Sequence, residues 1–238
     1  MVGKQAGRAP RRLGKARVAG VVIVALLLVA IVFTIVRAAG DDSGAKPAAS
    51  GPVVAPSGAV DGALVVGQAG APVKVEVYLD YMCPYCGQFE RANGDEIDRL
   101  IGDGTARLYL YPLAFLDEMS GGTRYSTRAA NAAATVYDQA PDKLLPFNNA
   151  LFAHQPPEGS TGLSDDQIAG LAGQAGVPKA ISDDFDERVF EPWVAASTQA
   201  AFDAGLGGTP TVKINGVKFE GDLYTVGPFT HAVTEAAK

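Results

Sequence analysis

One stretch decides the fold of this chain: Val73-Lys74-Val75-Glu76-Val77-Tyr78-Leu79, then Asp80-Tyr81-Met82, then Cys83-Pro84-Tyr85-Cys86. Residues 73–79 alternate in polarity and are rich in β-branched side chains, which predicts a strand. Residues 87–92 can continue as a helix. The two cysteines are therefore expected where a strand ends and a helix begins.

Cys83 is expected to be a reactive thiol because of this position. The N-terminus of a helix is the positive end of its dipole, which favours a thiolate and lowers the pKa of the thiol. Cys86, one helical turn later, can close a disulfide with Cys83 or resolve a mixed disulfide. Pro84 is tolerated in the first helical turn, where its missing N–H is not needed. The motif therefore predicts thiol–disulfide exchange with Cys83 as the nucleophile.

Two other uses of the cysteines remain open. The chain has two Cys and two His in all, and His154 and His231 are too far apart in the sequence for a compact zinc site. A structural disulfide fits an exported protein, although closing so short a loop restrains the unfolded chain little. Neither a metal nor a cofactor is expected.

A second motif, Gly207-Gly208-Thr209-Pro210-Thr211-Val212-Lys213-Ile214-Asn215-Gly216, lies much later in the chain. Its residues 211–214 alternate as a strand, and Asn215-Gly216 is typical of a hairpin turn. Pro210 comes directly before this strand, where a proline removes no ladder hydrogen bond.

The two motifs together resemble the thioredoxin-fold thiol–disulfide oxidoreductases of the DsbA type, especially the membrane-anchored forms of Gram-positive bacteria and actinobacteria. The resemblance covers about residues 64–238 and implies an α/β, thioredoxin-like fold. In this family a cis-proline before a strand faces the redox cysteines and leaves the preceding backbone free to pair with substrate. The resemblance implies a catalytic pair with four supporting residues, namely Cys83 and Cys86, supported by Pro84, Tyr85, Thr209 and Pro210.

One position departs from the family pattern. Many relatives carry an acidic residue six positions before the first cysteine, where it assists proton transfer, and here that residue is Val77. Glu76 is expected on the opposite face of the strand, because side chains alternate. Asp80 is nearer to the cysteines and is expected mainly to cap the end of the strand. The alternative is that its carboxylate supports the cysteines. No buried proton-transferring carboxylate is assigned.

The segment between the motifs resembles the helical insertion of the DsbA type, at about residues 120–204. Before it, residues 106–112 are expected to form a second strand, parallel to the first. Helical patterns cover residues 125–139, 143–154, 168–174 and 181–204. Ser164 and Gln167 are typical of a capping box before the third of these helices. Tyr125 and Trp193 are expected in the core, and both His are expected on the surface.

The N-terminal region has a different composition. Residues 1–37 carry seven Lys or Arg and no acid, whereas the chain as a whole has a net charge of −6. The uncharged, apolar residues 18–36 predict a transmembrane helix after a basic cytoplasmic tail (1–17), and the positive-inside rule then exports the rest of the chain. A cleaved signal peptide is the alternative. Residues 37–63, rich in Ala, Gly, Pro and Ser, predict a flexible stalk before a domain over residues 64–238.

These features predict an exported, membrane-tethered oxidoreductase that oxidises cysteine pairs of unfolded or partly folded secreted proteins. A membrane redox partner is expected to reoxidise it. The acidic body argues against nucleic-acid binding, which needs a basic face. The alternatives are a reductase or isomerase, and a peptide-binding module with a structural disulfide.

Overall fold

The computed structural model describes residues 52–238 of the chain. The predicted basic tail (1–17), transmembrane helix (18–36) and most of the stalk (37–51) lie outside these residues. Within the described residues, no helix is both long and apolar enough to cross a membrane.

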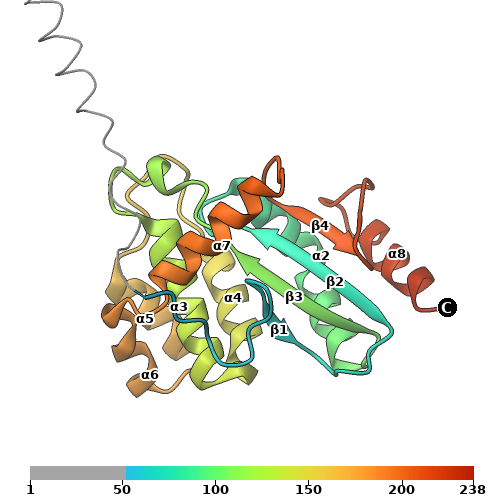
Figure 1. The fold of residues 1–238 in the computed structure, drawn as a ribbon, viewed down its shortest axis with the longest axis horizontal. Helices are drawn as coiled ribbons and strands as arrows, with labels where there is room; N and C mark the ends of the chain where they lie inside the picture. Colours follow the sequence, from blue (N-terminus) through green and yellow to red (C-terminus); the bar gives the residue numbers. More distant parts are fainter. Residues whose placement is uncertain (1–51) are drawn as a thin grey trace, which may run out of the picture. The chain divides into compact units, whose positions relative to one another are not determined.

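The centre of the described chain is a mixed sheet of five strands in the order β1-β3-β2-β4-β5 (Figure 1). The strands are β1 (Leu64–Val66), β2 (Val73–Leu79), β3 (Ala106–Pro112), β4 (Thr211–Ile214) and β5 (Val217–Lys218). β2 pairs in parallel with β3 and antiparallel with β4, so the predicted parallel pair is confirmed. The two sequence motifs thus lie on neighbouring strands.

Helices cover the two faces of this sheet differently. The helices α2 (Pro84–Gly102) and α8 (Pro228–Ala236) pack on the face to which the strands contribute aliphatic side chains. The helix α7 (Glu191–Asp203) lies against the opposite face, where Tyr78, Tyr109 and Tyr111 pack with Ala201. The alternating sequence of β2 produces this difference, because its valines and its polar residues point to opposite faces.

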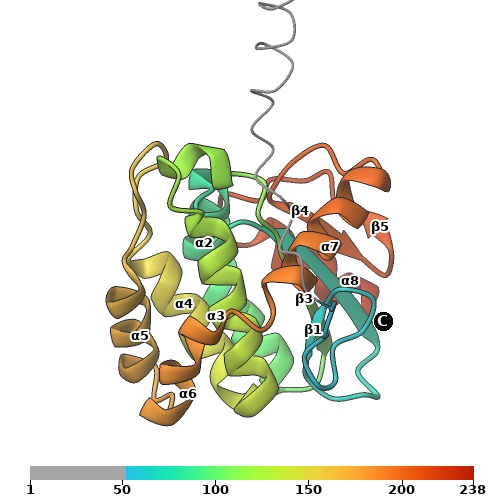
Figure 2. The same ribbon diagram turned by 60° about the vertical axis from the view of Figure 1, so that its left-hand side comes forward.

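The remaining helices form the expected insertion, gathered beside the sheet (Figure 2). They are η1 (Asp117–Ser120), α3 (Tyr125–Gln139), η2 (Pro141–Lys143), α4 (Leu144–Ala153), α5 (Asp165–Gln174), α6 (Lys179–Asp183) and η3 (Asp184–Glu187). α3 is buried along most of its length, and its alanines let the neighbouring helices approach closely. Tyr125 and Trp193 are buried as predicted, and His154 and His231 are exposed.

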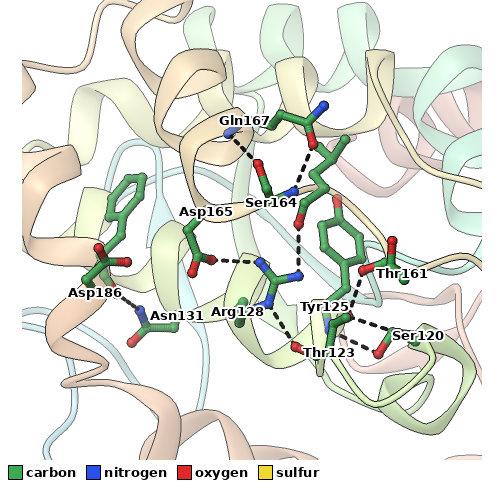
Figure 3. Close-up of polar contacts among 12 residues, drawn as sticks. Ser120, Thr123, Tyr125, Arg128, Asn131, Thr161, Ser164, Asp165, Gln167 and Asp186 are labelled. Carbon is green, nitrogen blue, oxygen red and sulfur yellow. Dashed lines mark hydrogen bonds and ion pairs between the residues drawn. The ribbon is translucent and has the colours of Figure 1, made fainter.

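A polar cluster joins α3 to the start of α5 (Figure 3). The Arg128 guanidinium donates to the Asp165 carboxylate at 2.7 Å and to the Leu163 carbonyl at 2.8 Å. Ser164 caps α5, and its backbone N–H donates to the Gln167 side chain, which completes the predicted capping box. One partly buried cation therefore joins two insertion helices.

The helical region predicted over residues 181–204 is present, but the structure divides it into α6, η3 and α7. Arg188, with φ of 55°, adopts a left-handed conformation between η3 and α7. The buried Asn131 side chain satisfies the backbone at this break: it donates to the Phe185 carbonyl and accepts from the Phe190 N–H. A residue of another helix thus replaces the hydrogen bonds that a continuous helix would make.

The end of the predicted stalk also differs from the structure. Ala63 is fully buried, and the segment before it is tied to α3 by hydrogen bonds. The Ser57 N–H donates to the Asp138 carboxylate at 2.7 Å, and the Tyr137 hydroxyl donates to the Gly58 carbonyl at 3.0 Å. Contacts with α3 fix this Gly- and Pro-containing segment, so the domain begins before residue 64.

Candidate active site

The structure places the two cysteines at the N-terminus of α2, as predicted. Cys83 is the N-cap residue, and Pro84 occupies the first turn. The Cys83 side chain is 5% exposed and Cys86 is 1% exposed, whereas Tyr85 between them is 57% exposed. Both thiols are free, so the structure corresponds to a dithiol state. Cys83 is therefore more accessible to solvent than Cys86.

The two thiols have opposite acidities. A hydrogen bond from the Cys86 side chain, helped by the backbone N–H groups of Cys86 and Tyr85, lowers the pKa of Cys83 from 9.0 to about 6, against the effect of burial. Burial, and then the neighbouring Cys83 sulfur, raise the pKa of Cys86 well above 9.0. At neutral pH the pair therefore holds one thiolate, at Cys83, and one thiol, at Cys86.

The second motif meets the first at these sulfurs. The Thr209–Pro210 peptide bond is cis, which confirms the expected conformation. The Thr209 carbonyl oxygen lies 3.3 Å from Cys83 Sγ. The Thr211 hydroxyl donates to the Gly208 carbonyl at 2.7 Å and fixes the turn before β4. Thr209 and Pro210 thus lie beside the more acidic thiol.

Asp80 is fully buried beneath the cysteines. Its carboxylate accepts hydrogen bonds from the Met82 N–H at 2.8 Å, the Ser126 hydroxyl at 2.6 Å and the Leu116 N–H at 2.9 Å. Its own N–H points at Cys86 Sγ, 3.5 Å away. The predicted cap at the strand end is therefore present, and the same carboxylate also joins the cysteine loop to α3.

The Asp80 carboxylate is electrostatically coupled to the site. Burial raises its pKa to about 6 although three hydrogen bonds oppose this, and the Cys83 thiolate adds to the rise. Asp80 was expected near the cysteines, but its burial depends on α3 and on the loop after β3. Residues 73–86 alone carry no signal of those contacts.

Gln155 is a part of the site that the sequence did not indicate. Its amide donates to the Tyr81 carbonyl at 3.0 Å and to the Cys83 carbonyl at 2.8 Å, and so holds the loop before α2. A Cβ on Gly87 would overlap the Gln155 side chain, so the glycine makes room for it. The contact joins the insertion to the cysteine loop, and only the fold brings the two together.

A second buried acid, Glu90, lines a small cavity together with Val77. Glu90, on α2, accepts a hydrogen bond from the Asn148 amide at 2.9 Å, and burial raises its pKa to about 7. Its carboxylate lies near the position that a Cβ on Gly94 would occupy, one turn further from the cysteines. Glu90 is therefore directed away from Cys86.

A large cavity opens beside the second motif, between α7 and the sheet. Its volume is about 1140 Å³, and Thr209 and Pro210 form one end of it. Tyr78, Tyr111 and Trp193 are among its lining side chains. Within residues 52–238 there is no group of His, Cys, Asp and Glu side chains that could hold a metal ion.

Comparison with known proteins places this arrangement in a family. A family model described as thioredoxin matches residues 59–226, which include both motifs and the whole insertion. The chain belongs to the thioredoxin family. The match begins within the segment predicted as stalk, in agreement with the contacts of residues 57–63.

Among solved structures, this thioredoxin-family chain is similar to two actinobacterial proteins. It is 29% identical to MdbA, a thiol-disulfide oxidoreductase from Actinomyces oris, with a TM-score of 0.66 over 76% of this chain and 91% of that one. It is 25% identical to reduced DsbA from Mycobacterium tuberculosis, with a TM-score of 0.60 over 74% of this chain and all of that one. The resemblance to the DsbA type is therefore confirmed.

A curated relative carries the same region within a larger protein. The thioredoxin-family chain is 34% identical over 157 residues to the serine/threonine-protein kinase PknE of Mycobacterium tuberculosis. The match covers 62% of this chain and 27% of the kinase, so the chain spans about a quarter of that relative's length.

Proposed function

We propose that the chain is an exported, membrane-tethered protein disulfide oxidoreductase that oxidises cysteine pairs of secreted proteins. The observation that carries this proposal is the opposite acidity of the two thiols, with the pKa of Cys83 at about 6 and that of Cys86 well above 9.0. A stabilised thiolate stabilises the reduced form, and a protein whose reduced form is stabilised is an oxidant.

The catalytic cycle begins with the Cys83–Cys86 disulfide. A substrate thiolate attacks Cys83 Sγ, which forms a mixed disulfide and releases Cys86, whose high pKa lets it take up a proton. A second substrate thiolate then attacks the substrate sulfur of the mixed disulfide. Cys83 leaves readily because it departs as a stable thiolate. The substrate loses two electrons and gains a disulfide, and the protein becomes a dithiol.

The neighbouring residues support these steps. Pro84 and Tyr85 shape the helix terminus, and the Thr209 backbone, held by Pro210, lies where an extended substrate chain would pair beside Cys83. Asp80 and Gln155 hold the loop that positions both sulfurs. The cycle needs neither a metal nor a cofactor, but a redox partner must reoxidise the dithiol.

Residues 1–36 of the sequence support export and tethering. The apolar run 18–36 after a basic tail supports a single membrane span with the domain on the outer side. An outer location also suits an oxidant, because a reductase there must receive electrons across the membrane. The reductase or isomerase is the second candidate, since it uses the same two sulfurs.

Two assays on the full-length chain test this function. The oxidised protein should speed the oxidative refolding of a reduced, disulfide-containing protein and should reduce insulin slowly. Fast insulin reduction without acceleration of refolding would support the reductase. If the protein shows neither activity, the remaining interpretation is a peptide-binding module with a structural disulfide.

A further inference from the structure

Asp80 contacts both cysteines through its backbone. Its carbonyl oxygen accepts a hydrogen bond from the Cys83 N–H at 3.0 Å, and its own N–H points at Cys86 Sγ, 3.5 Å away. Its side chain is fully buried and accepts from the Met82 N–H of the same loop at 2.8 Å. The carboxylate is therefore held inside the loop that carries the two sulfurs, out of contact with solvent.

This buried carboxylate has no cation to pair with. Within the described residues, no Lys, Arg or His forms an ion pair with Asp80. Hydrogen bonds alone stabilise its ionised form, from the Met82 and Leu116 N–H groups and from the Ser126 hydroxyl. A buried carboxylate without a counter-ion is costly to ionise, so a second negative charge nearby raises that cost further.

The Cys83 thiolate is such a second charge. It exists only after the Cys83–Cys86 disulfide has been reduced, because a disulfide carries no charge. Burial raises the pKa of Asp80 to about 6 and the Cys83 charge adds to the rise, while the hydrogen bond from Cys86 lowers the pKa of Cys83 to about 6. Two acids that repel each other and titrate in the same pH range share a proton, so their titrations are coupled.

Other titratable groups in the surrounding elements do not take this proton. Burial raises the pKa of Tyr125 on α3 above 10.0, so this phenol stays neutral. On η1, Asp117 pairs with Arg124 at 3.8 Å. Cys86 already holds its own proton in the dithiol, because burial raises its pKa well above 9.0. Asp80 is therefore the group whose ionisation responds to the charge on Cys83.

We propose that Asp80 is a proton acceptor of the redox reaction: it binds a proton when the Cys83–Cys86 disulfide is reduced and releases that proton when the disulfide forms. The buried site then carries one negative charge in either redox state. The charge is on the Asp80 carboxylate in the disulfide form and on the Cys83 sulfur in the dithiol form. This inference rests on the proposed function and gives it an acid at a different position from Val77.

Protons and electrons balance in this scheme. A substrate dithiol loses two electrons and two protons as its own disulfide forms. The two electrons reduce the Cys83–Cys86 bond, one proton goes to Cys86 and the other goes to Asp80. The partner that reoxidises the dithiol takes the two electrons, and Cys86 and Asp80 then release both protons. Above the pH range in which Asp80 titrates, the second proton goes to solvent instead.

The test is an NMR titration of the Asp80 carboxyl carbon in the full-length chain, held in detergent micelles. It is run once on the disulfide form and once on the dithiol form, and the signal is assigned by its loss in Asp80→Asn. We expect the carboxylate to bind a proton about tenfold more tightly in the dithiol form, the effect of one nearby like charge. A carboxylate that only fixes the loop would titrate at the same pH in both forms.

Asp98 is a control within the same molecule. It lies on α2, and burial raises its pKa too, but no cysteine contributes to that rise. Its carboxyl carbon should therefore titrate identically in the disulfide and dithiol forms. A shift of Asp98 as large as that of Asp80 would show a general change of the domain rather than a coupling to Cys83.

Alkylation of Cys83 measures the same coupling from the other side. Asp80→Asn removes the competing negative charge, so Cys83 should ionise at lower pH and react several-fold faster with iodoacetamide at about pH 5. A merely structural role predicts slower alkylation, because a loosened loop loses the backbone contacts that stabilise the thiolate. Asp98→Asn, the same substitution at an acid remote from the sulfurs, should leave the alkylation profile unchanged.

A third variant alters Asp80 without replacing it. Ser126→Ala removes one donor to the carboxylate and should raise the pH at which Asp80 titrates in both redox forms, while the difference between the forms remains. The matched control is Thr135→Ala, which removes a buried hydroxyl of the same helix that donates to the Asn131 carbonyl. This control should leave both Asp80 titrations unchanged.

Three results would overturn the inference. They are an Asp80 titration at equal or lower pH in the dithiol form, a shift of Asp98 equal to that of Asp80, and slower alkylation of Cys83 in Asp80→Asn. None of these measurements needs catalytic turnover, because dithiothreitol and a chemical oxidant prepare the two forms. A redox-dependent Asp80 titration in a chain that does not speed refolding would therefore reject the proposed oxidase and retain the proton coupling.

Discussion

The carbonyl oxygen of Thr209 lies 3.3 Å from Cys83 Sγ, although 126 residues separate the two in the chain. Parallel pairing of β2 with β3 and antiparallel pairing of β2 with β4 bring the two motifs together. The whole helical insertion lies between them in the sequence. Substrate pairing and sulfur chemistry can therefore occur at one point of the molecule.

The two cysteines should differ in their mutant phenotypes. Cys83→Ser should abolish thiol–disulfide exchange, because the buried Cys86 stays protonated at neutral pH. Cys86→Ala should instead accumulate mixed disulfides at Cys83, since no second thiol can resolve them. Non-reducing electrophoresis and mass spectrometry detect these adducts. Faster alkylation of Cys86 than of Cys83 at acidic pH would reverse the assignment.

The stability of the dithiol form should rise with pH relative to that of the disulfide form. The pKa of Cys83 is about 6 in the folded protein and near 9.0 when unperturbed, so between these values the folded state binds fewer protons than the unfolded state. The Cys83 contribution to stability is present in full near pH 9, and it is lost as the pH falls to 6. Allowing for solvent screening, we expect a change of roughly 1–3 kcal/mol in this window. Urea unfolding of the dithiol and disulfide forms at several pH values measures this change. If the unfolding free energies of the two forms vary with pH in parallel, the prediction is wrong.

Glu90→Gln should stabilise the protein at alkaline pH. Burial raises the Glu90 pKa from 4.5 to about 7, so the folded state binds more protons and loses stability as the pH rises through this window. Gln keeps an acceptor for Asn148 without the charge. Allowing for partial exposure, we expect a gain of about 1–2 kcal/mol at about pH 8 and none at about pH 4. Glu158→Gln, at an exposed site, is the control, and an equal gain at both pH values would refute the explanation.

Arg128 should matter more for stability than exposed cations do. Its side chain is 12% exposed and binds Asp165 and two backbone carbonyls (Figure 3). Arg128→Met leaves the two carbonyls without this donor and Asp165 with Arg188 alone, and it should cost about 1–3 kcal/mol of unfolding free energy. Lys179, which is 84% exposed in its pair with Asp183, is the matched control. Lys179→Met should change stability by less than about 0.5 kcal/mol. Equal losses of unfolding free energy in Arg128→Met and Lys179→Met, measured by thermal unfolding, would contradict this prediction.

Local patterns in the sequence were enough to predict much of the fold. The alternation before Cys83 predicted β2, and the Ala-rich run predicted α3 with both of its ends. Ser164 and Gln167 predicted the capping box of α5 because both partners lie within one turn. These features depend on neighbours in the sequence, so they do not require knowledge of the fold.

Contacts between distant segments could not be predicted in this way. The break at Arg188 depends on the Asn131 side chain from α3, and the helical pattern of residues 181–204 shows no sign of it. Gln155 contacts the cysteine loop only because α4 ends there. The cavity beside the second motif lies between α7 and the sheet, so it depends on a relationship between two elements rather than on a motif in either.

The most direct test of the central claim is the reduction potential of the Cys83–Cys86 pair. The full-length chain is equilibrated with mixtures of reduced and oxidised glutathione, and thiol labelling gives the fraction reduced. A stabilised Cys83 thiolate, with Pro84-Tyr85 between the cysteines and no acid at Val77, predicts a value of roughly −130 to −200 mV, on the oxidising side of thioredoxin. A value below about −250 mV, close to that of thioredoxin, would contradict the oxidase and support the reductase.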